Sequence, residues 1–143
     1  MQSRTAYSLL FSVTLAVLLT SCAQRIPTTE GEITSEEELV EFLTDENLNP
    51  VPVGPAHQPA LTTEGEEYRV GAWGNIQIFE YDNEGTAFGE AQRLVPVVPD
   101  LGPEADPEPE SHVYQNGNMV VVYFGSAPQV TNILNRSLGS QMR

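Results

Sequence analysis

The chain has 143 residues, of which 20 are acidic and 6 are basic, and its formal net charge at pH 7 is −14. This length fits one domain with tails, and so few cations argue against nucleic-acid binding, which requires neutralisation of phosphates. All six basic residues are arginines, which excludes chemistry that needs a lysine, such as Schiff-base formation or a phosphate-binding loop.

The first 21 residues have the organisation of a secretory signal. Arg4 lies in a short polar start, an apolar run follows from Leu9 to Leu19, and small residues come next. A run of eleven residues is shorter than the roughly 20 residues that cross a bilayer. The uncharged stretch 5–24 leaves an uncleaved membrane anchor as the alternative.

The residues Leu19-Thr20-Ser21-Cys22 resemble the lipobox of bacterial lipoproteins, in which an aliphatic residue and two small residues precede an invariant cysteine. The resemblance implies cleavage after residue 21 and acylation of Cys22 with fatty acids such as palmitate. Cys22 is the only cysteine of the chain, and acylation explains an odd thiol in an exported protein.

This reading divides the chain into a signal peptide at 1–21, a flexible tether at 22–34 and a single domain at 35–143. The tether is polar and has no apolar period. Ala23, rather than aspartate, follows the cysteine. By resemblance to other lipoproteins, this implies the periplasmic face of the outer membrane in a cell that has two membranes.

The first predicted element of the domain is a helix. Ser35-Glu36-Glu37-Glu38 begins a capping box, and Leu39, Phe42 and Leu43 follow at helical spacing. We expect the helix to end at 47–49, before Pro50. Four prolines lie in the next ten residues, which predicts an extended loop over 50–60.

Two alternating segments, 66–71 and 75–81, predict a hairpin with Trp73-Gly74 at its turn. Asp82 or Asn83 then caps a predicted helix that runs to about Val95. Its apolar stripe contains Ala87, Phe88, Ala91, Leu94 and Val95. A loop rich in proline and acidic residues follows over 96–110.

The strongest local signal is Asn116-Gly117, because it stands between the apolar segments 111–115 and 118–124 and favours a type I′ hairpin. Ser126 is the predicted cap of a last helix, with Pro128 just inside its start. The apolar face of that helix carries Val130, Ile133, Leu134 and Leu138, and Gly139 ends it.

Two hairpin-plus-helix units, 66–95 and 111–139, are therefore candidates for an internal repeat. We expect an α+β fold: a four-stranded antiparallel sheet with helices packed mainly on one face. The segment Met119–Phe124 is apolar on both sides, which predicts a central strand.

The C-terminal half, from His112-Val113-Tyr114 through Val120-Val121-Val122-Tyr123 to Leu138-Gly139, resembles small hypothetical lipoproteins of diverse bacteria. Their pattern is an aromatic residue before a glycine turn, a valine-rich strand and a helix that closes with Leu-Gly. The segment Gln77-Ile78-Phe79-Glu80-Tyr81 looks like theirs as well. The resemblance implies no activity.

The candidate binding site is a face of the second hairpin. A two-residue turn would pair Tyr114 with Met119 and His112 with Val121, so that His112, Tyr114, Met119, Val121 and Tyr123 share one face. If the helices lie on the other face, this one is exposed and suits a partner or ligand in the envelope. The alternative is that the N-terminal helix or the proline-rich segments cover it.

The favoured function is a non-enzymatic, lipid-anchored binding or structural module without a metal or cofactor. One alternative is a small hydrolase or accessory enzyme that uses His112 with Glu80 or Glu110. Another is a cation-binding protein built on the acidic loop from Asp100 to Glu110. His57 and His112 would form a metal or catalytic site only if the fold joins them.

Overall fold

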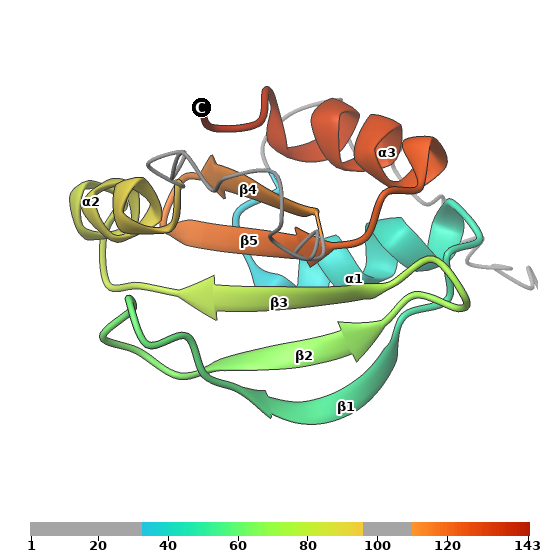
Figure 1. Cartoon of the computed structure of the whole chain (residues 1–143), viewed down its shortest axis with the longest axis horizontal. Coiled ribbons are helices and arrows are strands. Elements are labelled where there is room, and N and C mark those ends of the chain that lie inside the picture. Colours follow the sequence, from blue (N-terminus) through green and yellow to red (C-terminus); the bar gives the residue numbers. More distant parts are fainter. Residues whose placement is uncertain (1–32, 96–109) are drawn as a thin grey trace, which may run out of the picture.

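The structure is a computed structural model that describes residues 33–95 and 110–143. Its elements are α1 (Glu36–Asp45), β1 (Val51–Ala56), β2 (Gly65–Arg69), β3 (Asn75–Glu80), α2 (Glu84–Leu94), β4 (Ser111–Asn116), β5 (Met119–Phe124) and α3 (Pro128–Leu138) (Figure 1). The predicted α+β class is confirmed. The signal, most of the tether and most of the acidic loop lie outside the described residues. In the part described, no helix has the length and apolar character to cross a membrane.

The strands form one antiparallel sheet in the order β1-β2-β3-β5-β4. The sheet therefore has five strands rather than the expected four, because the predicted loop at 50–60 contains β1. Its prolines, Pro52 and Pro55, are compatible with a strand at the edge of the sheet, where a missing N–H breaks no ladder. The pairing with β2 shifts register between Pro52 and Gly54.

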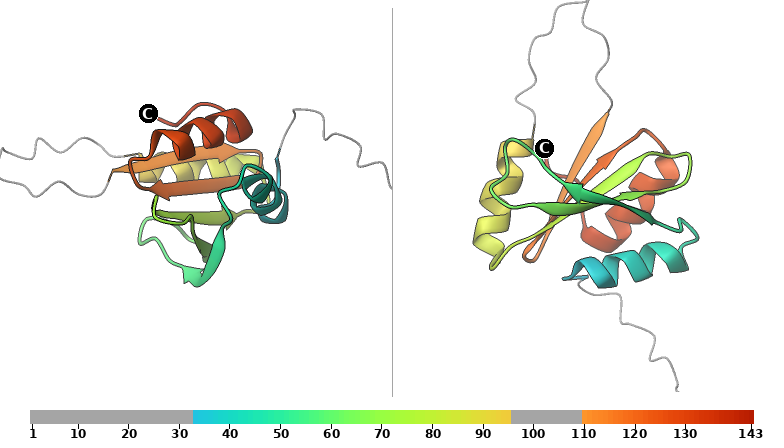
Figure 2. Two further views of the ribbon diagram at one scale, coloured as in Figure 1. Left: turned by 90° about the vertical axis from the view of Figure 1, so that its right-hand side faces the viewer. Right: turned by 90° about the horizontal axis from the view of Figure 1, so that it is seen from below.

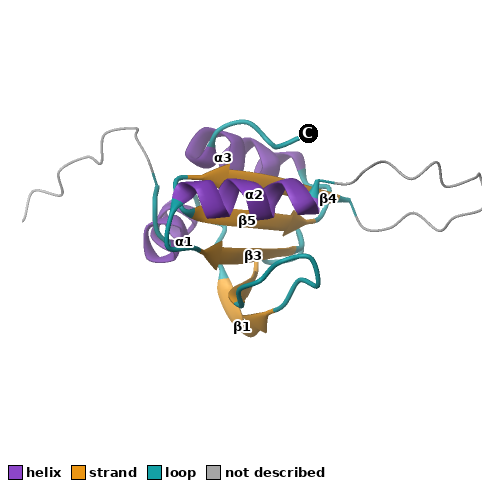
Figure 3. Ribbon diagram, turned by 90° about the vertical axis from the view of Figure 1, so that its left-hand side faces the viewer, coloured by secondary structure: helices purple, strands orange, loops and turns teal. Residues whose placement is uncertain are grey.

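The helices cover both faces of the sheet, two on one face and one on the other, so the expected majority face exists but the opposite face is covered as well. α2 lies on one side and α1 and α3 lie on the other (Figures 2 and 3). Both core layers draw on β5: Met119, Val121 and Tyr123 pack with α1 and α3, whereas Val120 and Val122 pack with α2. A strand that is apolar on both sides needs cover on both sides. β5 lies inside the sheet, between β3 and β4, although the middle strand of the five is β3 rather than the predicted 119–124.

The hairpin of β4 and β5 forms as predicted but in a different register. Tyr114 pairs with Val121 and Asn116 with Met119, two positions from the predicted pairing. The turn is Gly117-Asn118, and of these two residues only Gly117 has a positive φ, of 55°. A type I′ turn needs positive φ at both, so that prediction is wrong. A shift of two residues keeps every side chain on its face.

The predicted helix starts are largely confirmed. Ser35 Oγ accepts from the Glu38 N–H at 3.3 Å, and Asn83 Oδ1 accepts from the Thr86 N–H at 2.9 Å. α3 begins one residue later than expected, with Ala127 as its N-cap and Pro128 in its first turn. Its apolar face is buried as predicted, and Gly139 ends it with φ 89°.

The buried stripe of α2 differs from the prediction. Ala87 and Ala91 are buried, but Phe88 is 47% exposed and Glu90 is only 5% exposed. The Glu90 carboxylate accepts from the Thr62 N–H at 3.0 Å and from the Arg93 guanidinium at 2.6 Å. These two bonds compensate the burial of a charge and turn α2 so that Phe88 faces outward.

Two tyrosines of the α1–α3 core provide a matched stability test. The Tyr114 hydroxyl is buried without a hydrogen-bond partner, whereas the Tyr123 hydroxyl donates to the Trp73 carbonyl at 2.5 Å and accepts from the Ala127 N–H at 3.2 Å. Tyr114→Phe should leave the free energy of unfolding unchanged or raise it by up to about 1 kcal/mol, and Tyr123→Phe should lower it by about 1–3 kcal/mol. Urea denaturation measures both. An equal loss in the two variants would contradict this description of the core.

Candidate functional site

The predicted binding face is buried, which corrects the sequence interpretation. The side chains do share one face, but His112 is 9% exposed and Tyr114, Met119, Val121 and Tyr123 are at most 1% exposed. Tyr114, Met119, Val121 and Tyr123 belong to the core layer that contains α1 and α3. The alternative, cover by the N-terminal helix, is the observed arrangement, and α3 adds to it.

His112 is held by contacts on each side of its ring. The imidazole stacks on Tyr123 with ring centroids 5.6 Å apart and planes 18° apart. Nδ1 lies 3.0 Å from Gln141 Oε1, and Nε2 lies 3.1 Å from the Gly125 carbonyl oxygen. The ring thereby connects β4 to the loop before α3 and to the C-terminal tail.

Of the predicted partners of His112, only Glu110 lies near it. Glu110 Oε1 is 3.8 Å from His112 Nε2, beyond hydrogen-bond distance. Glu80 lies four residues along β3 from Ile76, the residue in the row of His112, which is about 13 Å at the rise of a strand. His57 follows β1 at the opposite edge of the sheet from β4.

Residues 33–95 and 110–143 bring no three histidine, cysteine or acidic side chains together in a way that could hold a metal ion. Of the acidic loop from Asp100 to Glu110, only Glu110 is described. The cation-binding alternative therefore stays a prediction. Cys22 also lies outside the described residues.

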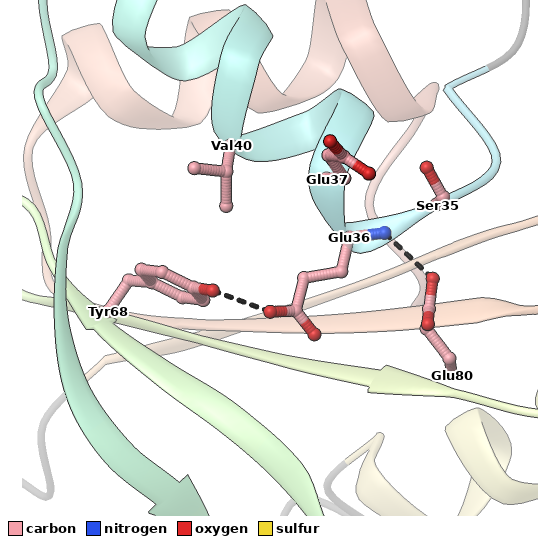
Figure 4. Close-up of a pocket in the computed structure, with 6 residues that line it drawn as sticks. All are labelled: Ser35, Glu36, Glu37, Val40, Tyr68 and Glu80. Atoms are coloured by element: carbon pink, nitrogen blue, oxygen red, sulfur yellow. Dashed lines mark hydrogen bonds between the residues drawn. The ribbon is translucent and has the colours of Figure 1, made fainter.

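The structure does show a cleft at the N-terminus of α1, which the sequence analysis missed. Its volume is about 410 Å³. α1 contributes one wall, and β2 and β3 contribute the other (Figure 4). The lining residues are Ser35, Glu36, Glu37, Val40, Tyr68 and Glu80.

Two hydrogen bonds join the walls of the cleft. The Glu36 N–H, at the start of α1, donates to Glu80 Oε1 at 2.8 Å, and the Tyr68 hydroxyl donates to Glu36 Oε1 at 2.5 Å (Figure 4). The first bond satisfies one of the free amides that every helix start leaves. Burial, followed by the hydrogen bond and negative charge of Glu36 and by the charge of Glu66, raises the pKa of Tyr68 to about 12.

The cleft is chemically one-sided. Three carboxylates and two hydroxyls line it, and none of its lining residues is basic. It can accept hydrogen bonds and attract positive charge, but it contains no activated nucleophile. Glu36 and Tyr68 were visible in the sequence only as part of a capping box and of an alternating strand, because their meeting depends on how α1 docks on the sheet.

A second polar cluster lies on the α2 side of the sheet. Gln58 donates to Gln77 at 2.6 Å, Gln77 donates to Glu67 at 2.8 Å, and Asn75 donates to the other Glu67 oxygen at 2.7 Å. The chain of amides satisfies both carboxylate oxygens. The network therefore fixes the pairing of β2 with β3 and holds the loop after β1.

Comparison with protein-family models, with curated proteins and with solved structures found no match to this chain.

The raised pKa of Tyr68 predicts a loss of stability in alkali. Because its pKa is about 12 in the folded chain against an ordinary 10.0, the fold favours the neutral phenol. This contribution is complete below about pH 10 and is lost as the pH rises through about 12. The unfolding free energy of Tyr68→Phe should therefore fall less between these pH values than that of the unsubstituted chain.

A second variant tests the same interaction by spectroscopy. Glu36→Gln removes a negative charge beside the phenol but keeps an acceptor, so the pKa of Tyr68 should fall. Absorbance of phenolate during an alkaline titration measures this. An unchanged titration in Glu36→Gln, or an unchanged stability profile in Tyr68→Phe, would show that the two residues do not interact as described.

Proposed function

We propose that the chain is a lipid-anchored protein of the cell envelope, with a domain that is a non-enzymatic binding or structural module. The observation that carries the proposal is Cys22, the only cysteine, directly after Leu19-Thr20-Ser21 and an apolar run. A signal of this form both exports the chain and places the thiol where a lipid is attached.

Electrostatics supports a covalent anchor. After removal of residues 1–21, the chain keeps 20 acidic residues and 5 arginines, so an anionic bilayer repels it. Acyl chains overcome this repulsion because each buried methylene contributes about 0.8 kcal/mol. Because Ile33 packs against the core, the proposed flexible tether is 23–32, and ten residues have an end-to-end distance of about 17 Å. This exceeds the Debye length of about 8 Å and so keeps the acidic domain clear of the surface charge.

The proposed membrane location follows from the residue after the lipidated cysteine. Ala23 is not an aspartate, so a cell with two membranes should send the protein to the outer one. No acidic export tag stands directly after Cys22, and the proposed location is therefore the periplasmic leaflet.

The contacts of His112 support a non-catalytic role for the domain. A general base needs a free nitrogen that a substrate can reach, whereas this ring is 9% exposed and both of its nitrogens have partners. The histidine thus acts as a connector of the fold. The alternative of a hydrolase that uses His112 with Glu110 stays a prediction.

The lipid anchor is tested by Cys22→Ser, with Ser21→Ala as the matched control that keeps a small residue before the cysteine. We expect the unsubstituted chain and Ser21→Ala to lose residues 1–21, gain the mass of a diacylglyceryl group and partition into detergent. Cys22→Ser should keep its first 21 residues. Mass spectrometry and detergent phase separation measure these outcomes. A free thiol at Cys22 in the purified native protein would overturn the proposal.

A further inference from the structure

The outward face of α2 is an uncharged surface on a strongly acidic protein. α2 packs on β4 and β5 with Ala87 and Ala91, and no other described helix or strand lies in front of it (Figure 3). Between Glu84 and Arg93, the exposed residues carry no charge, and they are Gly85, Thr86, Phe88, Gly89 and Gln92. The net charge of the chain is −14, yet a second copy meets no like charge along the middle of this face.

Phe88 is the apolar centre of the face. It is 47% exposed, and a phenyl ring contributes its full stabilisation only when it is covered. Gly85 and Gly89 lie beside it, and a Cβ at Gly89 would meet no atom of the chain within 4 Å. Glycine weakens a helix relative to alanine, and no contact of the described chain requires it at position 89. The two glycines leave room beside the ring for the close approach of another helix.

The charges at the two ends of α2 favour an antiparallel partner helix. Glu84 lies in the first turn and Arg93 in the last. The Arg93 guanidinium contacts Glu90 through Nη1, and its side chain is 58% exposed. In an antiparallel pair, the start of each helix lies at the level of the end of the other, so that unlike charges and opposed helix dipoles meet. A parallel pair would bring like charges together at both ends.

We propose that the outward face of α2 binds a second copy of this chain, with the two helices antiparallel about a two-fold axis near Phe88. The two phenyl rings pack on each other across the axis. Gly85 of each copy faces Gln92 of the other, because these positions are equally far from an axis between positions 88 and 89. The same patch thus serves both copies, as in other two-fold dimers.

The size of the face determines how strong this dimer is. α2 has 11 residues and is therefore about 16 Å long. Two such helices bury much less than the roughly 800 Å² per partner of a standard interface. We therefore expect a weak dimer that forms where lipid anchors concentrate the copies on one membrane. The inference rests on the proposed function for this setting, whereas the contact itself needs no lipid.

The first test compares Phe88→Glu with Val53→Glu in the full native chain, held in detergent micelles. The control makes the same change at a residue that is 51% exposed on β1, the edge strand away from α2. Sedimentation equilibrium should give equal dissociation constants for the unsubstituted chain and Val53→Glu, and a dimer at least about tenfold weaker for Phe88→Glu. Equal constants in all three chains, or an unsubstituted chain that stays monomeric up to about 1 mM, would overturn the proposal.

Cysteine cross-linking tests the orientation of the helices. A mixture of Gly85→Cys and Gln92→Cys should form a mixed disulfide dimer under mild oxidation, because these two positions face each other. Either variant alone should not, since the two copies of one position lie about 10 Å apart along the axes, beyond the reach of a disulfide. Non-reducing electrophoresis measures the products. Cross-linking of each variant with itself, or none in the mixture, would contradict the antiparallel pair, and the result does not depend on the folding of Phe88→Glu.

The unsubstituted chain is the control for the lipid. Cys22 is its only cysteine, so a lipidated chain has no free thiol and should form no disulfide dimer. A disulfide dimer of this control would show that Cys22 is free, which contradicts the lipid anchor and leaves the helix pair to be judged by sedimentation. Mass spectrometry of the linked peptides separates a Cys22 disulfide from one between positions 85 and 92. Failure of the helix pair is therefore distinguishable from failure of the proposed function.

Discussion

The burial of β5 on both of its faces is the constraint on which the rest of the fold depends. Its side chains alternate between two core layers, with Tyr123 on the α1–α3 side and Val122 on the α2 side. Neither layer can be left open to water, because the valines and aromatics of the strand contribute their stabilisation only when covered. The two edges of the strand are paired as well, with β3 on one side and β4 on the other. The placement of helices on opposite faces follows for the same reason.

The Tyr123 hydroxyl extends this constraint to the ends of the neighbouring elements. It joins the β2–β3 turn, through Trp73, to the start of α3, through Ala127. Two glycines make the close approach feasible: a side chain at Gly74 or Gly125 would collide with backbone atoms of the other segment, and both have positive φ. The interior strand therefore positions a turn on one side of it and a helix on the other.

Local signals in the sequence predicted most of the helices and strands. The features that depend on distant segments were missed. The capping residues Ser35 and Asn83 and the apolar period of α3 are short-range features, and each is observed. β1 was missed because prolines argue against a strand unless it is known to lie at an edge, and that depends on the whole sheet. The face of Tyr114 and Tyr123 was correctly grouped, since alternation is local. The burial of this face could not be predicted, because the positions of α1 and α3 do not follow from the local sequence.

The same limit applies to the cleft. Glu36 and Tyr68 are 32 residues apart in sequence and meet only because α1 docks against the sheet. A capping glutamate has a sufficient local explanation at a helix start, so nothing in the sequence indicated a second contact. The binding face that the sequence predicted belongs to a single hairpin, whereas the cleft needs two distant segments.

The prolines of β1 have a consequence for how large any assembly of this protein can become. A sheet that can add strands at both edges polymerises without a limit, and fibres grow in this way. Here one edge is closed by residues that lack the hydrogen-bonding group, so growth has a single direction. Two copies that joined edge to edge through β4 would expose only their β1 edges, so an assembly of this kind would stop at two copies.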